Sequence, residues 1–339
     1  MEQIPYDTIK NTAPYGLEKT KEPSKLNLWK VLVFFAALMA VFVFFGSYIQ
    51  YRLGMGGVVI TELMFLAASI LFVRLQKIPL RQVFPLHRPK GLALGSTAVL
   101  WAAAYLSMII VNLILAYFYP AGVLGSGNSA NLVITSIPWG IAFLVVAVLP
   151  AVCEEALHRG VIQYGVQNSL RNPWLIVLLM GLLFGAFHVS IWKFLPTAML
   201  GAAMSYLLLR TGNMVYSCFF HFLHNGIQML LLLPSGYMMG AVPASSLEEL
   251  AYGYLRKILP VSIGLYLCFG AIIPFLFYLS HWMLIRCQMG RPIPFLPWGP
   301  ARKKTLLWIL IPTFVLLAAG CLTLMLSISS LAPYPWFSG

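Results

Sequence analysis

Charged residues are scarce in this chain. Only 9% of its 339 residues are Asp, Glu, Lys or Arg, and 60% are hydrophobic, whereas a soluble domain carries about 25% charged residues. Acidic residues are the scarcest, with nine Asp and Glu against 22 Lys and Arg. This composition excludes an ordinary soluble domain. It predicts an all-α, polytopic integral membrane protein, because helices satisfy their own backbone polar groups in lipid.

The chain also lacks the cysteine patterns of a disulfide framework or a zinc knuckle. Its five cysteines form no CxxC pair, and most lie in apolar stretches, which is typical of small core residues. The net charge of +13 does not indicate nucleic-acid binding, because the basic residues form short clusters between apolar runs and not one basic face. We therefore expect the lipid bilayer as a partner and no nucleic acid.

Nine apolar runs are long enough to cross about 30 Å of hydrocarbon as helices. They fall near residues 31–49, 57–74, 93–118, 137–158, 174–192, 194–210, 213–233, 259–281 and 305–331, with a tight turn around Lys193 between the fifth and the sixth. The sequence thus predicts eight or nine transmembrane helices. We divide the chain into a tail with N-terminal helices (1–130), a core that holds the fourth to seventh runs (131–233), and an external loop at 234–257 with C-terminal helices (234–339).

Basic residues are distributed unevenly between the two sides of these runs. Eighteen of the 22 fall on the side of the N-terminal tail, and four, namely Arg52, Lys193, Arg256 and Lys257, fall on the other. Cytoplasmic loops hold most of the Lys and Arg of a membrane protein. We therefore expect a multi-pass protein of the cell membrane with a cytoplasmic N-terminus.

Three acidic residues, Glu62, Glu154 and Glu155, lie within apolar runs. A charge at the bilayer centre costs about 2.5–3.5 kcal/mol on insertion scales, so a carboxylate there is a candidate functional group. Four of the six histidines lie between residues 158 and 224, which concentrates carboxylates and imidazoles in the fourth to seventh runs. Glu62 lies outside that region, and we interpret it as a structural contact to a neighbouring helix.

Helical spacing separates the two adjacent glutamates. Glu155 and Arg159 are four residues apart with the acid first, the order that favours an ion pair on one helix face. Glu154 points about 100° away around the helix and has no basic partner in its own segment. We interpret Glu155 and Arg159 as a supporting pair and Glu154 as an available base.

Two later runs supply the remaining polar groups of a hydrolytic site. With Glu154, His188 can take a proton from a water molecule that attacks a peptide carbonyl. His221 and Asn225, one helical turn apart, can donate hydrogen bonds to the developing oxyanion. Gly185 permits close approach of another helix near His188.

Three motifs combine these residues in one order along the chain. EEALHR fits EExxxR, FGAFH fits FxxxH and HFLHN fits HxxxN. Together they resemble the CPBP family, the CAAX proteases and bacteriocin-processing enzymes, over roughly residues 135–233. The resemblance implies an intramembrane endopeptidase that acts on a peptide or a lipidated protein. Its catalytic residues would be Glu154, His188, His221 and Asn225 in the roles above, supported by Glu155 and Arg159.

The resemblance requires no cofactor, but zinc is an alternative. The chain contains no HExxH, so the zincin arrangement is absent. One glutamate and two histidines, here Glu154, His188 and His221, are nevertheless ligands that zinc accepts.

One position departs from the family pattern. Members often carry an aromatic residue before the motif arginine, where this chain has His158. We interpret His158 and His224 as structural histidines. Cys153, beside Glu154, offers a rival thiol nucleophile, but it points to a different helix face and lies outside the motif.

A second functional class stays open. A non-proteolytic membrane protein would be either a bacteriocin immunity or maturation scaffold or a transporter that uses Glu and His as a proton relay. Transporters often show repeats or helices broken in matching halves, and the sequence shows neither. The three motifs therefore favour the endopeptidase.

Overall fold

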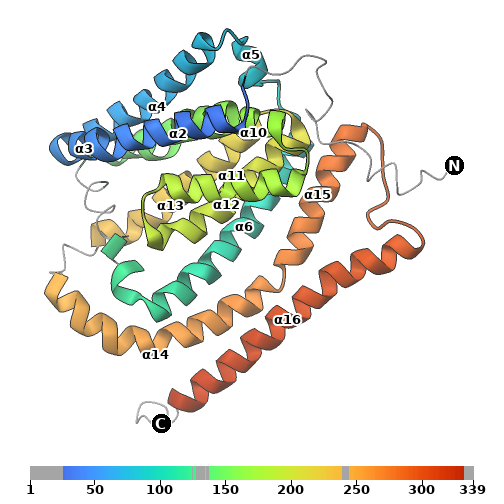
Figure 1. The fold of residues 1–339 in the computed structure, drawn as a ribbon. Helices are drawn as coiled ribbons and strands as arrows, with labels where there is room; N and C mark the ends of the chain where they lie inside the picture. The colour runs from blue at the N-terminus through green and yellow to red at the C-terminus, as the bar shows by residue number, and fades with distance from the viewer. Residues whose placement is uncertain (1–25, 124, 127–133, 135–136, 239–243, 332–339) are drawn as a thin grey trace.

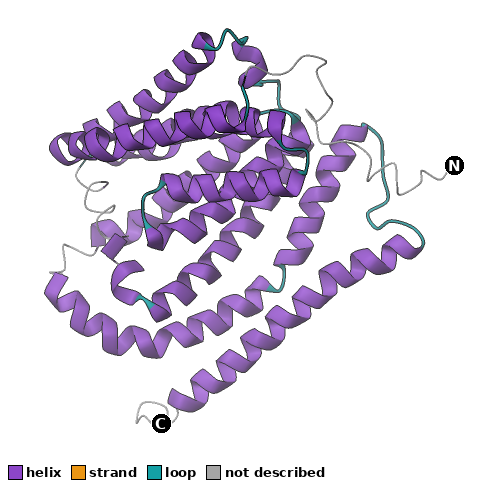
Figure 2. Ribbon diagram, in the orientation of Figure 1, coloured by secondary structure: helices purple, strands orange, loops and turns teal. Residues whose placement is uncertain are grey.

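The computed structural model describes residues 26–123, 125–126, 134, 137–238 and 244–331, and the side chains of all of these except 232–238, 244–256 and 330–331. Every described element is a helix (Figure 2). The all-α prediction is therefore confirmed for this part of the chain.

Most of the helices follow one another with short connections. In chain order they are α2 (Leu28–Val41), η1 (Phe42–Gly46), α3 (Ser47–Leu53), α4 (Met55–Leu75), α5 (Leu80–Val83), α6 (Gly91–Phe118), α8 (Trp139–Phe143), η2 (Leu144–Val148), α9 (Leu149–Glu155), η3 (Ala156–Ile162), α10 (Gln163–Ser169), α11 (Pro173–Phe187), α12 (Ile191–Thr211), α13 (Val215–Met238), α14 (Ala244–Gly270), α15 (Ile273–Met289) and α16 (Pro300–Leu331). The three η segments are π-helical turns within longer helices.

Seven stretches of the described chain are long and apolar enough to cross a membrane. They are Leu28–Leu53, Met55–Leu75, Gly91–Phe118, Trp139–Ser169, Ile191–Thr211, Lys257–Met289 and Pro300–Ser329, and α11 is a shorter apolar helix. The remaining predicted run lies on α13, which has 24 residues. A polytopic helical membrane protein is therefore confirmed.

Two predicted boundaries differ from the structure. The turn between the fifth and sixth runs lies at 188–190, and Lys193 already belongs to α12. Val189 has a φ of 47°, a left-handed conformation that is an outlier for a β-branched residue and ends α11. The eighth run is not one helix, because α14 ends at Gly270 and α15 begins at Ile273, after two intervening residues. Pro274 lies in the first turn of α15, where a missing N–H is tolerated.

The predicted external loop at 234–257 is mostly helical. α13 continues to Met238 and α14 begins at Ala244, so only residues 239–243 separate the two helices, and these lie outside the described residues. The predicted loop and the eighth run therefore share one helix, α14.

The motif segment lies at the centre of the bundle. In Figure 1, α2 to α4 lie on one side and α14 to α16 on the other, with α6 and α9 to α13 between them. Burial agrees with this arrangement. In the most apolar part of Trp139–Ser169, 56% of the residues are buried, whereas in the most apolar part of Pro300–Ser329 only 6% are buried. Helix α16 packs along α14 and otherwise presents apolar side chains outward, as a lipid-facing helix does.

A tight hairpin of α11 and α12 holds the second motif. Asn172 caps the N-terminus of α11, because its side chain accepts hydrogen bonds from the first free N–H groups, and Pro173 lies in the first turn. Both residue types are common at these positions of a helix. A Cβ at Gly185 would lie 2.7 Å from the carbonyl oxygen of Phe194. The expected close approach at Gly185 is thus present, and it fixes the end of α11 against α12.

Candidate active site

The first motif lies where an α-helix changes into a π-helix. Glu154 and Glu155 end α9, and His158 and Arg159 lie in η3. π-Helical turns are frequent at functional sites because they displace side chains from regular spacing. Glu155 and His158 are completely buried, Arg159 is 1% exposed and Glu154 is 8% exposed. Charged groups buried to this extent require specific partners.

Glu155 and Arg159 form the ion pair that their spacing predicts. Nη1 of Arg159 donates to Oε1 of Glu155 at 3.0 Å. Nη2 donates to the carbonyl oxygen of Gly201 on α12 at 2.9 Å. The guanidinium carbon also lies 4.7 Å from the centroid of the Phe184 ring on α11, within the range of a cation–π contact. Arg159 therefore ties η3 to both helices of the α11–α12 hairpin.

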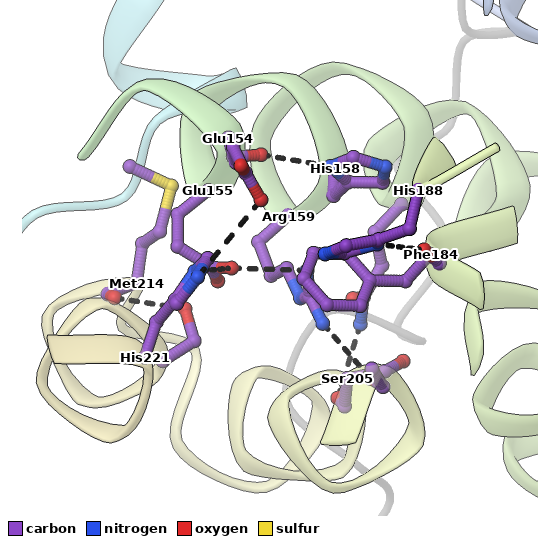
Figure 3. A network of polar contacts seen from close by, with 12 residues as sticks. Glu154, Glu155, His158, Arg159, Phe184, His188, Ser205, Met214 and His221 are labelled. Carbon is purple, nitrogen blue, oxygen red and sulfur yellow. Dashed lines mark hydrogen bonds and ion pairs between the residues drawn. The ribbon is translucent and has the colours of Figure 1, made fainter. Parts of the chain in front are cut away.

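His221 on α13 reaches both glutamates (Figure 3). Its Nδ1 lies 3.2 Å from Oε1 of Glu155, and its Nε2 lies 3.9 Å from Oε2 of Glu154. Because an ionised carboxylate only accepts, the Nδ1–H of His221 donates to Glu155. Nε2 then faces Glu154, so the available glutamate receives its basic neighbour from another helix.

His188 caps the C-terminus of α11. Its Nδ1–H donates to the carbonyl oxygen of Phe184 at 2.9 Å, a bond that fixes the tautomer of a neutral ring and leaves Nε2 as the free nitrogen. His188 is half-buried. It makes no direct hydrogen bond with Glu154 in the described structure, so a proton moving between these two residues would pass through a water molecule.

Asn225, like His188, lies outside the Glu154–His221 contact. Its Nδ2 donates to the carbonyl oxygen of Val146 in η2 at 2.9 Å. The amide group has a second hydrogen that this bond does not use. Asn225 is half-buried, one helical turn after His221 as its spacing predicts.

His158 is surrounded by three phenylalanine rings. Its ring lies edge-on to Phe35, Phe184 and Phe187, with centroids 5.9, 5.0 and 4.8 Å away. Its Nδ1–H donates to the backbone carbonyl of Glu154 at 2.9 Å. His158 therefore packs as an aromatic residue would at this motif position. Its side chain hydrogen-bonds to the backbone of Glu154, consistent with a structural histidine.

His224 faces away from the glutamates. Its Nε2 contacts Nε2 of Gln228 at 2.5 Å, and its ring lies edge-on to Tyr105 of α6 at 5.8 Å. These contacts fit the structural interpretation of His224.

Two residues of the site were not predicted. Phe184, which is 2% exposed, contacts Arg159 with its face and has the rings of His188 and His221 at 5.0 and 5.7 Å. Its signal in the sequence is the first position of FxxxH. Glu62 of α4 is 6% exposed, and its carboxyl group lies within hydrogen-bonding reach of that of Glu154. Its signal was its position within an apolar run.

The residues proposed for zinc are not arranged as a ligand set. Among the described residues, no group of three His, Cys, Asp or Glu side chains is placed to hold a metal ion. His221 and His188 each use Nδ1 in a hydrogen bond, to Glu155 and to a backbone carbonyl, which leaves both Nε2 atoms available. The three side chains are nevertheless not placed around a common point. The geometry of Glu154, His188 and His221 in this structure therefore does not fit a three-ligand zinc site, and no chemical step is derived through a metal.

A helical membrane bundle with buried glutamates and histidines from three helices fits a membrane-embedded protease. Comparison with protein families gives the more particular assignment: residues 136–227 match the Rce1-like family, described as type II CAAX prenyl endopeptidase Rce1-like. The match covers all three motifs and confirms the resemblance to CPBP proteases. No curated protein and no solved structure gives a significant match.

Proposed function

We propose that this protein is an intramembrane endopeptidase in which Glu154 activates a water molecule for peptide hydrolysis. The observation that carries the proposal is the placement of His221, which contacts both Glu154 and Glu155 from a different helix. Arg159 balances the charge of Glu155 and contacts no carboxylate oxygen of Glu154 in the described structure. Glu154 is thus the carboxylate available for proton transfer.

The proposed reaction begins with a water molecule between Glu154 and His188. Glu154 takes a proton from the water while the water oxygen forms a bond with the peptide carbonyl carbon. General-base catalysis of such a step raises the rate by about 10²–10⁴-fold. When the C–N bond breaks, the same proton passes to the leaving amine. The reaction thus consumes one water molecule and returns Glu154 to its initial state.

The oxyanion of the intermediate requires hydrogen-bond donors. His221 is a candidate because Glu155 holds its Nδ1–H and orients the ring, so that Nε2 points away from Glu155 and toward the Glu154 side of the site. Asn225 has one amide hydrogen beyond that used on Val146. Removal of one such donor costs about 10²–10³-fold in turnover in other hydrolases, so both are assigned this role.

The substrate class follows from where the site lies. The motif helices are buried within a membrane bundle, and His188 and Asn225 are half-buried. We therefore assign the cleaved bond to a peptide that reaches the bilayer, either the C-terminal peptide of a prenylated protein or a hydrophobic precursor peptide. The charge distribution supports a cell-membrane location with a cytoplasmic N-terminus, which reporter fusions at the two ends of the chain would test.

Purified protein in lipid nanodiscs, assayed with fluorogenic prenylated and precursor peptides, tests the proposed reaction. Glu154→Gln and His188→Ala should lower cleavage at least about 10²-fold. His281→Asn is the matched control, because His281 contacts Tyr206 outside the motif residues, and it should cleave normally. Full activity of Glu154→Gln would exclude Glu154 as the base. Failure of every peptide to be cleaved would favour the scaffold or the transporter.

Metal dependence needs a separate measurement. We propose that the reaction requires no metal ion. Incubation with a zinc chelator should leave the cleavage rate unchanged, and elemental analysis should find less than one zinc per chain. Loss of activity on chelation, with recovery on adding zinc, would restore the zinc alternative.

A further inference from the structure

Helix α4 runs beside the motif segment, although it lies outside the matched family region. Near its start, Met55 packs in one apolar cluster with Ala142 and Val145 of α8 and η2. Near its middle, Phe65 packs in another cluster with Leu157 of η3. Glu62 lies between these contacts along α4. The register of the two segments therefore places Glu62 opposite α9, which carries the catalytic glutamate.

The carboxyl groups of Glu62 and Glu154 meet in this interface. They lie within hydrogen-bonding reach of each other, and both residues are buried, with 6% and 8% exposure. Neither Oε2 of Glu62 nor Oε2 of Glu154 accepts a hydrogen bond from an N–H or hydroxyl group among the described residues. The contact is therefore one between two acids.

Two buried carboxylates in contact require a proton between them. Like charges at hydrogen-bonding distance in a region of low dielectric repel strongly, and such pairs share one proton, as in the aspartic-protease dyad. The nearest cations do not relieve the repulsion. Arg159 and the Nδ1–H of His221 are both engaged by Glu155, and Nε2 of His221 lies 3.9 Å from Glu154. Cys153 is the other titratable neighbour on α9, and its thiol supplies no positive charge.

We propose that Glu62 is a positioning residue for the reaction, whose carboxyl group shares one proton with that of Glu154 and so holds Glu154 toward the attacking water. This inference rests on the proposed function of Glu154. The bond occupies one oxygen of Glu154 and leaves the other to accept the proton of water. Glu62 touches neither the substrate nor the reacting atoms in this role.

The proton count of the pair is restored in each turnover. The resting pair holds one proton, shared between the two carboxyl groups, and this proton lies on Glu62 when Glu154 acts as the base. When Glu154 accepts a proton from water the pair holds two, and when the leaving amine takes one the pair returns to one. The proton taken from water is the one that the leaving amine receives, so the cycle closes.

Three variants of α4 separate positioning from simple packing. Glu62→Gln keeps the size of the side chain and an N–H donor toward Glu154, and should retain kcat within about threefold. Glu62→Leu fills the same space without a donor, and should lower kcat at least tenfold with KM changed less than threefold. Thr61→Val is the matched control. It removes the partly buried hydrogen bond between Gln50 and Thr61 one residue away, so it should lower the melting temperature and leave kcat unchanged.

A spectroscopic measurement detects the shared proton without relying on cleavage. In protein labelled with isotopic glutamate, the infrared C=O stretch of a buried protonated carboxyl group should be present at neutral pH and absent from Glu62→Gln. Wild-type kcat in a folded Glu62→Leu variant, or equal loss of kcat in Glu62→Gln and Glu62→Leu, would overturn the positioning role. Absence of the infrared signal would overturn the shared proton. If no peptide is cleaved although the infrared signal is present, the proposed function fails and the carboxyl pair stands.

Discussion

His221 and Glu155 are joined by a hydrogen bond that crosses between two membrane helices. Nδ1 of His221 lies 3.2 Å from Oε1 of Glu155, and the same oxygen accepts a bond from Arg159 at 3.0 Å. One carboxylate oxygen thus holds a cation from its own helical segment and an imidazole from α13. Glu155 therefore orients the ring that faces Glu154.

Replacing Glu155 with Gln should lower both stability and turnover. The amide cannot balance the buried guanidinium of Arg159, and breaking a buried ion pair by removing one partner costs about 3–5 kcal/mol. Turnover should fall because His221 loses the charge that orients it. The double variant Glu155→Gln with Arg159→Met should unfold at a higher temperature than Glu155→Gln alone, since the uncompensated charge is gone. Thermal unfolding in nanodiscs measures both. A double variant less stable than either single variant would contradict the prediction.

Replacing His158 with Phe should be tolerated. The ring lies among Phe35, Phe184 and Phe187, and its buried Nε2 has no hydrogen-bond partner among the described residues. A phenylalanine keeps the edge-on packing and removes a buried polar atom, while the bond to the Glu154 carbonyl is lost. We expect a stability change of about 1.5 kcal/mol or less.

The cleavage rate of His158→Phe should be compared with the rates of the same exchange at His188 and His221. The same exchange at His188 or His221 should abolish activity, because these two rings are assigned to proton transfer and to oxyanion binding. If His158→Phe is as inactive as His221→Phe and still folded, His158 has a chemical role beyond packing.

Local features of the site could be predicted from the sequence, and contacts between helices could not. The Glu155–Arg159 pair depends on a spacing of four residues in one segment, which helix geometry fixes. The pairing of His221 with both glutamates depends on how α13 is rotated and shifted against α9. The same is true of Glu62, whose neighbour is set by the register of α4 on α9. No pattern within a single helix encodes these relations.

The end of α11 also could not be predicted from the sequence. The apolar run from 174 to 210 has no glycine or proline at residues 188–190, so the turn there was placed at the charged Lys193. The structure ends α11 with Val189 in a left-handed conformation, next to His188. Strained backbone of this kind occurs at functional sites because the surrounding structure holds it in place. Sequence patterns predict unstrained turns, and they therefore miss this one.

Close packing of α12 on α11 should make Gly201 intolerant of a side chain. A Cβ at Gly201 would lie 2.5 Å from Cβ of Phe184, an atom that moves only with its backbone. Gly201→Ala must therefore push the two helices apart, at a cost of about 1–3 kcal/mol for overpacking. The shift also moves the Gly201 carbonyl away from Nη2 of Arg159 and Phe184 away from its guanidinium. We expect a lower melting temperature and a lower cleavage rate.

Gly226 provides the control for this substitution. It lies within α13, and a Cβ there would meet its nearest neighbour, the ring of Phe143, at 3.6 Å, which is ordinary contact. An alanine in a helix interior without a clash is more stable than glycine by about 0.5–1 kcal/mol. Gly226→Ala should therefore raise the melting temperature while Gly201→Ala lowers it. Opposite signs from one chemical change would show that helix separation at Phe184, and not helix propensity, limits position 201. Equal signs would mean that α11 and α12 can move apart freely, and Arg159 would then not depend on their spacing.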